Sequence, residues 1–235
     1  MRIVVTSLLI ARLALAQMFP FPGPGPVSVT VVPIALVNQT VATVITAFNI
    51  PAAASGHTLI AILGAYGANG PYVDSIVQTN VTWTRLTYST NGPWEYEEWY
   101  GIVSGTGGTG VTINWDSGYL PVSYATASIT EWSNVYTVSP INGQAYISGG
   151  SGYATVGSFS TTYANSLVIV SAMGLGADPG TVPTGFTALG YLTVYTGAIQ
   201  SGYKTAPSAG PQGGGTFGNS LGVEWITYGI GLRHN

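Results

Sequence analysis

The sequence predicts an all-β protein, a single antiparallel β-sandwich of the jelly-roll type with an extra strand before it. Short runs rich in β-branched and aromatic residues recur along the chain, and Gly, Pro, Asn and Ser separate them. No stretch long enough for a helix places apolar residues at a 3.6-residue spacing. Because no helices are available to cross over a parallel sheet, about a dozen strands are expected to form two antiparallel sheets packed face to face.

Residues 1–16 are expected to be a secretory signal peptide. Arg2 precedes an apolar stretch over residues 3–11, and the small-x-small sequence at 14–16 precedes Gln17. Arg12 interrupts the pattern, and the alternative is a retained apolar strand. No later apolar run approaches the roughly 18 residues of a membrane span, so the mature chain is expected to lie outside the cell without crossing a membrane.

Residues 17–39 are expected to hold a tether and a strand that precedes the domain. Residues 17–26, QMFPFPGPGP, are typical of an extended polyproline-like spacer, because proline fixes φ and lacks a donor. Valine then alternates with Ser and Thr, which indicates a strand with one apolar face, and Pro33 places its later part at an edge or a bulge. The residues expected to contact another subunit are Val27, Val29, Val31, Ile34 and Leu36. The alternative is that this strand folds back onto the sheet of its own subunit.

Residues 40–235 are expected to form the β-sandwich domain. The runs that follow His57 and Asn165 resemble each other and are continuously apolar, as in a strand buried on both faces. We interpret them as strands with similar roles in one domain and not as a tandem repeat. The expected strands cover residues 41–48, 58–66, 81–89, 94–103, 111–115, 122–132, 145–148, 154–160, 166–173, 186–195, 198–205 and 222–232.

Composition limits the chemistry. Charged residues make up 6% of the chain, against roughly 25% in an ordinary soluble domain. Five basic residues cannot neutralise a phosphate backbone, which argues against nucleic acid as a partner. The chain has no Cys and two His, which leaves little for zinc or for acid–base catalysis. We therefore expect no enzyme activity, no metal and no cofactor, and a stability that is nearly flat with pH.

The densest polar cluster lies in residues 94–100, WEYEEWY. On a strand, Glu95 and Glu97 share one face with Trp99, and Glu98 lies on the other face. A structural role, in which the charges discourage stray strand pairing, is the favoured interpretation. The alternative is a sugar or calcium site, and its candidate sugar-binding residues are Trp94, Glu95, Glu97 and Trp99.

The remaining acidic and basic motifs have structural interpretations. Glu131 and Glu224 each precede a tryptophan and are expected to be buried or half-buried carboxylates with hydrogen bonds, because no nucleophile or base accompanies them. Lys204 is the one lysine and could form an isopeptide crosslink, although nothing in the sequence indicates its burial. Asn38 and Asn80 begin Asn-x-Thr sequons and are candidate N-glycosylation sites in a secreted chain.

Residues 40–232 resemble a secreted β-sandwich module of bacterial and archaeal surface proteins. Its motifs appear here as ASGHTLIA at 54–61, WEYEEWY at 94–100, GVTINW at 110–115, EWSN at 131–134 and NSLVIV at 165–170. With an extra strand before a charge-poor, Cys-free module, the chain is similar to subunits of archaeal extracellular filaments, the thread and bundling-pilus type. The resemblance implies that copies assemble into a helical or linear polymer, each inserting its N-terminal strand into a neighbour.

A second hypothesis is a secreted carbohydrate-binding module or adhesin, because six Trp and 15 Tyr could stack on sugar faces. A glycoside hydrolase would need two carboxyl groups across a cleft, and a viral coat protein is a further use of jelly rolls. The direction in which the aromatic rings point separates the first two hypotheses.

Overall fold

The computed structural model describes residues 32–43, 46–119 and 121–235, and residues 33–235 form one compact unit. Strands dominate this part, and its helical element is a short 3-10 turn at Ser117–Tyr119. No helix in the described ranges could cross a membrane. The prediction of an all-β fold with antiparallel sheets is confirmed.

Residues 34–133, here called the N-terminal half, form two antiparallel sheets. The five-stranded sheet has the order β1-β8-β3-β6-β5, and the three-stranded sheet has the order β2-β7-β4. The strands are β1 (Ala35–Thr43), β2 (Ala47–Asn49), β3 (Thr58–Gly67), β4 (Val73–Val77), β5 (Val81–Asn91), β6 (Trp94–Val103), β7 (Gly110–Trp115) and β8 (Val122–Ser133).

Residues 134–235, the C-terminal half, form a second five-stranded sheet of order β13-β14-β12-β17-β9 and the two-stranded pairs β10-β16 and β11-β15. The strands are β9 (Ile141–Gly149), β10 (Gly152–Thr155), β11 (Phe159–Thr161), β12 (Ser166–Gly174), β13 (Thr187–Val194), β14 (Gly197–Ala206), β15 (Gly210–Gln212), β16 (Thr216–Leu221) and β17 (Trp225–Leu232).

The two halves follow the same path. In each large sheet the first strand of the half pairs with the last strand, and the last strand pairs with the central strand. The central strand then pairs with the second strand of a hairpin, whose first strand is the far edge, giving β1-β8-β3-β6-β5 and β9-β17-β12-β14-β13. The central strands β3 and β12 contain the two similar apolar runs, as expected. The interpretation that these runs have similar roles in one domain agrees with their equivalent central places, whereas the rejection of a tandem repeat does not agree with the repeated strand order.

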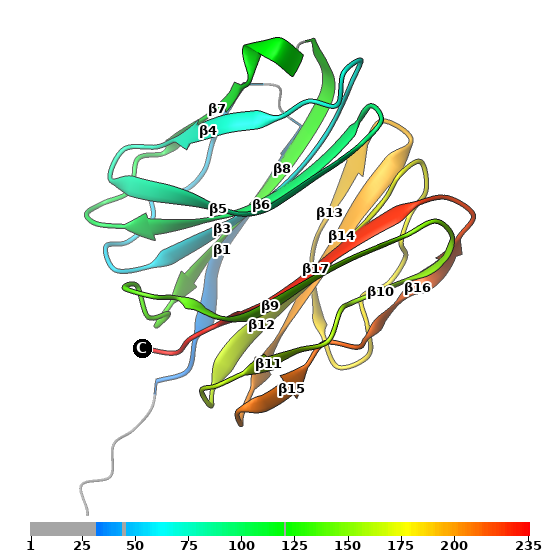
Figure 1. Ribbon diagram of the computed structural model, residues 1–235. Coiled ribbons are helices and arrows are strands. Elements are labelled where there is room, and N and C mark those ends of the chain that lie inside the picture. Colours follow the sequence, from blue (N-terminus) through cyan, green and yellow to red (C-terminus); the bar gives the residue numbers. More distant parts are fainter. Residues whose placement is uncertain (1–31, 44–45, 120) are drawn as a thin grey trace, which may run out of the picture. The chain divides into compact units, whose positions relative to one another are not determined.

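The molecule has four layers in place of the expected single pair of sheets (Figure 1). The two large sheets pack against each other, and each also packs against the smaller sheets of its own half. The core between the large sheets includes Ile60, Tyr96, Trp132, Leu167, Ile169, Met173, Ile199 and Ile230. Because β3 and β12 are buried along nearly their whole length, both of their faces need a covering layer.

The first described strand belongs to the N-terminal half itself. β1 begins after Pro33, which lacks an N–H for a sheet ladder, and pairs with β8 through Thr43. The expected domain boundary before Thr40 therefore falls inside this strand. Ile34 is buried between the large sheets, and Leu36 packs against the same core. Val27, Val29 and Val31 lie outside the described residues.

Candidate functional site

Strand β6 carries three of the eight acidic residues into the interior. Glu95, Glu97 and Glu98 are each at most 1% exposed. Their side chains alternate as the sequence predicts: Glu97 bonds to Trp99 on one face, and Glu98 reaches Ser171 of the opposite large sheet on the other. Two buried carboxyl groups therefore lie inside the N-terminal half, and one lies between the halves.

Glu97 has compensating partners. Its Oε1 accepts the backbone N–H of Val73 at 3.0 Å, and its Oε2 accepts the indole N–H of Trp99 at 2.6 Å. Arg85 places Nε 3.1 Å from the same Oε2, with its guanidinium 4.2 Å above the ring centre of Tyr72. A buried charge persists only with such partners, so Glu97 and Arg85 form the ion pair of this interior.

Glu95 lacks comparable partners. Neither of its carboxyl oxygens has a hydrogen-bond partner among the described residues. Burial raises its pKa well above the ordinary range, and the neighbouring Glu97 raises the pKa further. Glu95 is therefore held in its protonated form more strongly than an exposed glutamate would be.

Glu98 connects the two large sheets. Its Oε1 accepts hydrogen bonds from the hydroxyl groups of Tyr96 and Ser171, and its Oε2 is buried without a partner among the described residues. Burial raises the pKa of Glu98 to about 7, although the bonds from Ser171 and Tyr96 lower it. The interface between the halves thus contains a carboxyl group that titrates near neutral pH.

Burial argues against sugar binding by the candidate residues on β6. Trp94, Glu95, Glu97 and Trp99 are between 0% and 9% exposed. An aromatic face must be open for a sugar ring to stack on it, and a carboxylate must be reachable. In the part of the chain that the structure describes, no group of three or more His, Asp or Glu is arranged to hold a metal.

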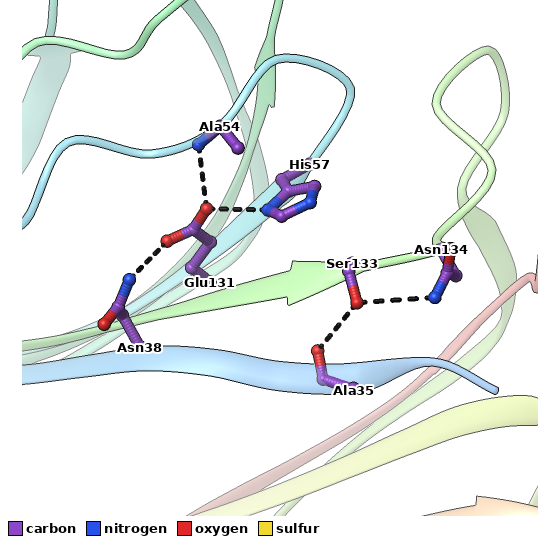
Figure 2. A network of polar contacts seen from close by, with 7 residues as sticks. All are labelled: Ala35, Asn38, Ala54, His57, Glu131, Ser133 and Asn134. Atoms are coloured by element: carbon purple, nitrogen blue, oxygen red, sulfur yellow. Dashed lines mark hydrogen bonds and ion pairs between the residues drawn. The ribbon is translucent and has the colours of Figure 1, made fainter. Parts of the chain in front are cut away.

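Glu131 anchors the start of the N-terminal half (Figure 2). Its carboxylate accepts a hydrogen bond from Asn38 Nδ2 at 2.8 Å and another from the backbone N–H of Ala54 at 2.9 Å. Its Oε1 also lies 2.7 Å from Nδ1 of His57. Burial alone would raise its pKa, but these bonds and the charge of His57 outweigh burial and lower the pKa. The prediction of a buried, hydrogen-bonded carboxylate is confirmed for Glu131. It was wrong for Glu224, which is exposed.

The two sequons differ in accessibility. Asn38 is half-buried, and its side-chain nitrogen, the atom that a glycan would modify, donates to Glu131. Asn80 is exposed in the turn before β5 and donates to the carbonyl of Thr106. Asn80 is the better placed of the two for a glycan.

Lys204 is half-buried on β14, and its Nζ lies 4.7 Å from the ring centre of Phe186. Among the described residues it forms no ion pair with a carboxylate. An isopeptide bond needs a carboxyl or amide group against the amine, so the structure gives this alternative no support.

The outer edges of the large sheets are β1, β5, β9 and β13. These strands contain one charged residue, Arg85, and its guanidinium is turned inward to Glu97. Proteins commonly guard an edge with lysine or proline, and these strands have neither; each edge pairing instead contains one register shift. The large side chains that these edge strands expose, at 39–48%, are Val37, Val41, Tyr88, Tyr146, Ile147 and Tyr191.

An aromatic cluster that the sequence analysis missed joins the halves. Tyr195, in the turn between β13 and β14, stacks on Tyr66 of β3 with ring centres 4.4 Å apart, and Trp94 and Tyr124 lie beside them. Tyr195 has φ of 52°, a region that non-glycine residues seldom adopt. No sequence pattern links these four residues, since each comes from a different strand or turn.

The chain matches no protein-family model, no curated protein and no solved structure among those compared. The likeness to filament subunits therefore rests on the sequence motifs.

Proposed function

We propose that the protein is a structural subunit of an extracellular cell-surface filament, assembled by strand addition between copies. The observation that carries the proposal is the character of the edges: four edge strands of the large sheets present neutral side chains to solvent. An edge strand without charge is a template for another chain, because its outer N–H and C=O groups can pair. Each of these edges contains a register shift, which twists an edge strand, but none presents a charged side chain to solvent.

The donor in this proposal is the segment before β1. All strands of the described part lie between Ala35 and Leu232, and Ile34 and Leu36 serve their own core. The donor is therefore reduced to Val27, Val29 and Val31. Residues 17–31 can span up to about 50 Å when extended, enough to reach a neighbouring copy. A donor on one subunit and an acceptor edge on the next make a heterologous contact, which propagates into a fibre.

The proposed fold of each half is a jelly roll. The orders β1-β8-β3-β6 and β2-β7-β4 agree with two interleaved sheets of one eight-stranded roll, with β5 joined to the larger sheet. In the C-terminal half, Gly218 and Asn219 of β16 donate backbone N–H groups to Thr181 and Pro179, which supplies a strand-like segment where β4 lies in the first half.

The test places the same charge on opposite faces of the donor in the full-length protein. Val27→Lys with Val29→Lys puts two lysines on the apolar face, and the matched control Ser28→Lys with Thr30→Lys puts two on the other. Negative-stain microscopy and size-exclusion chromatography report assembly. We expect filaments from the wild type and the control, and monomers from the Val27/Val29 variant.

Two results would overturn the proposal. Filaments from the Val27/Val29 variant would show that the apolar face is not buried in a neighbour. Loss of filaments in both variants would show that assembly responds to charge alone and not to insertion of one face. Deleting residues 17–31 is a further check, because Ile34 and all of β1 remain and the truncated protein should stay folded without polymerising.

A further inference from the structure

A polar hollow of about 340 Å³ lies where the two halves meet. The N-terminal half contributes the end of β5, and the C-terminal half contributes the end of β9, the turn after it and the start of β17. The lining includes Ser89, Asn91, Tyr146, Gly149, Gly150 and Glu224.

The lining selects the chemistry of a ligand. Hydroxyl groups, one amide and one carboxylate face the hollow, so it offers donors and acceptors together. No basic side chain lines it, which disfavours phosphate or carboxylate ligands. Few apolar side chains line it, which disfavours a lipophilic ligand. A neutral, hydroxylated molecule is the class that remains.

The polar groups are already positioned by bonds across the two halves. Asn91 Nδ2 donates to Oε2 of Glu224, and the hydroxyl groups of Ser89 and Tyr146 lie 2.8 Å apart. Because each pair joins one residue from each half, the groups are held by the packing of the halves. Tyr146 is 44% exposed, so part of its ring is open for the C–H face of a sugar.

Two glycines shape the hollow. A Cβ at Gly149 would lie 2.4 Å from Cζ2 of Trp225, so the backbone must be bare for the indole to pack there. A Cβ at Gly150 would meet nothing within 4 Å, and Gly150 does not have positive φ. A side chain at position 150 can therefore extend into open space without straining the backbone.

We propose that this hollow binds a neutral saccharide. Sugar hydroxyl groups donate to Glu224, accept from Asn91 and exchange hydrogen bonds with Ser89, while the sugar ring lies against Tyr146. The described residues that line the hollow all lie at position 89 or later, on or beside strands β5, β9 and β17.

The test uses saturation-transfer difference NMR on the full-length protein, with glucose, galactose, mannose, N-acetylglucosamine and their β-linked disaccharides as probes. Titration then gives the dissociation constant of any probe that binds. We expect at least one to bind, and we expect Glu224→Gln and Gly150→Leu each to weaken that binding at least tenfold. The first removes the charged acceptor, and the second adds a bulky side chain at a lining position.

Asp74→Asn is the matched control, because it neutralises an exposed carboxylate on β4, far from the lining, and should leave binding unchanged. Unchanged thermal unfolding of the variants confirms that they fold. The proposal is overturned if no probe gives saturation transfer, if binding survives both Glu224→Gln and Gly150→Leu, or if Asp74→Asn weakens it equally.

Discussion

Strands β6 and β14 hold equivalent places in the two halves, each beside the central strand of its large sheet, yet their interiors differ. β6 buries three carboxyl groups, whereas β14 has none and buries the neutral side chains of Gln200 and Ser201. The same strand path is thus built with and without buried acids. The difference teaches that the fold does not require the carboxyl groups of β6, and that their partners decide whether they stabilise the N-terminal half.

Among the substitutions that test this comparison, removal of Arg85 should lower the free energy of unfolding most. Arg85→Met leaves Glu97 buried beside Glu95 without its cation, and breaking a buried ion pair from one side costs about 3–5 kcal/mol. The counterpart in the C-terminal half, Gln200→Ala, removes one neutral hydrogen bond, to the carbonyl of Ser201, and should cost about 1 kcal/mol. Urea unfolding of both variants measures the contrast, and equal costs would contradict the special role of the β6 acids.

Glu98 should make stability depend on pH, in contrast to the flat profile expected from composition. Its folded pKa of about 7 exceeds the value of 4.5 in an unfolded chain, so the folded state holds a proton that the unfolded state has lost. Stability therefore falls as pH rises from about 4.5 to 7, by about 3 kcal/mol, and Glu95 adds in the same direction.

Glu131 acts with the opposite sign. Its pKa is lowered, so its contribution is present above about pH 4.5 and is lost as the pH falls through its folded value. Together, the opposite contributions of Glu98 and Glu131 should make the free energy of unfolding largest near pH 4 to 5. Urea titrations between pH 4 and 8 check this, and Glu98→Gln should remove much of the slope. An unchanged slope in that variant would assign the pH dependence to other groups.

The smallest difference in stability is expected between substitutions in the two Glu-Trp dipeptides. Glu131→Gln weakens the bonds that its carboxylate accepts from Asn38, Ala54 and His57, and should cost about 2 kcal/mol. Glu224→Gln changes an exposed carboxylate and should stay within about 0.5 kcal/mol. Melting temperatures of the two variants separate them, and similar losses would mean that burial does not explain the difference.

The sequence was sufficient for the class of fold and for the faces of β6. Alternation of Glu97 and Glu98 between two faces follows from strand geometry alone, and the continuous apolar runs of β3 and β12 identify central strands. These features are local, so the order of residues along one strand specifies them.

The repeated path and the burial of the acids are not local. Strand runs have the same appearance whether they form two layers or four, because pairing partners lie far apart in the chain. Glu131 and Glu224 are each followed by tryptophan. Glu131 lies near the end of β8, opposite Asn38 of β1, whereas Glu224 precedes β17 and lines the hollow. The hollow itself combines residues from positions 89 to 226, which no spacing rule connects.

The contacts that hold the start of β1 have a mechanical consequence. In the proposed filament, tension from a neighbour enters each subunit at Pro33, whose carbonyl accepts a hydrogen bond from Asn134, and Asn38 is bonded to Glu131 a few residues later. Because β1 lies along β8, a pull parallel to the strands loads their hydrogen bonds together, in shear, and does not open them one at a time. The end of the subunit that bears the load first is thus the end where side chains reinforce the ladder.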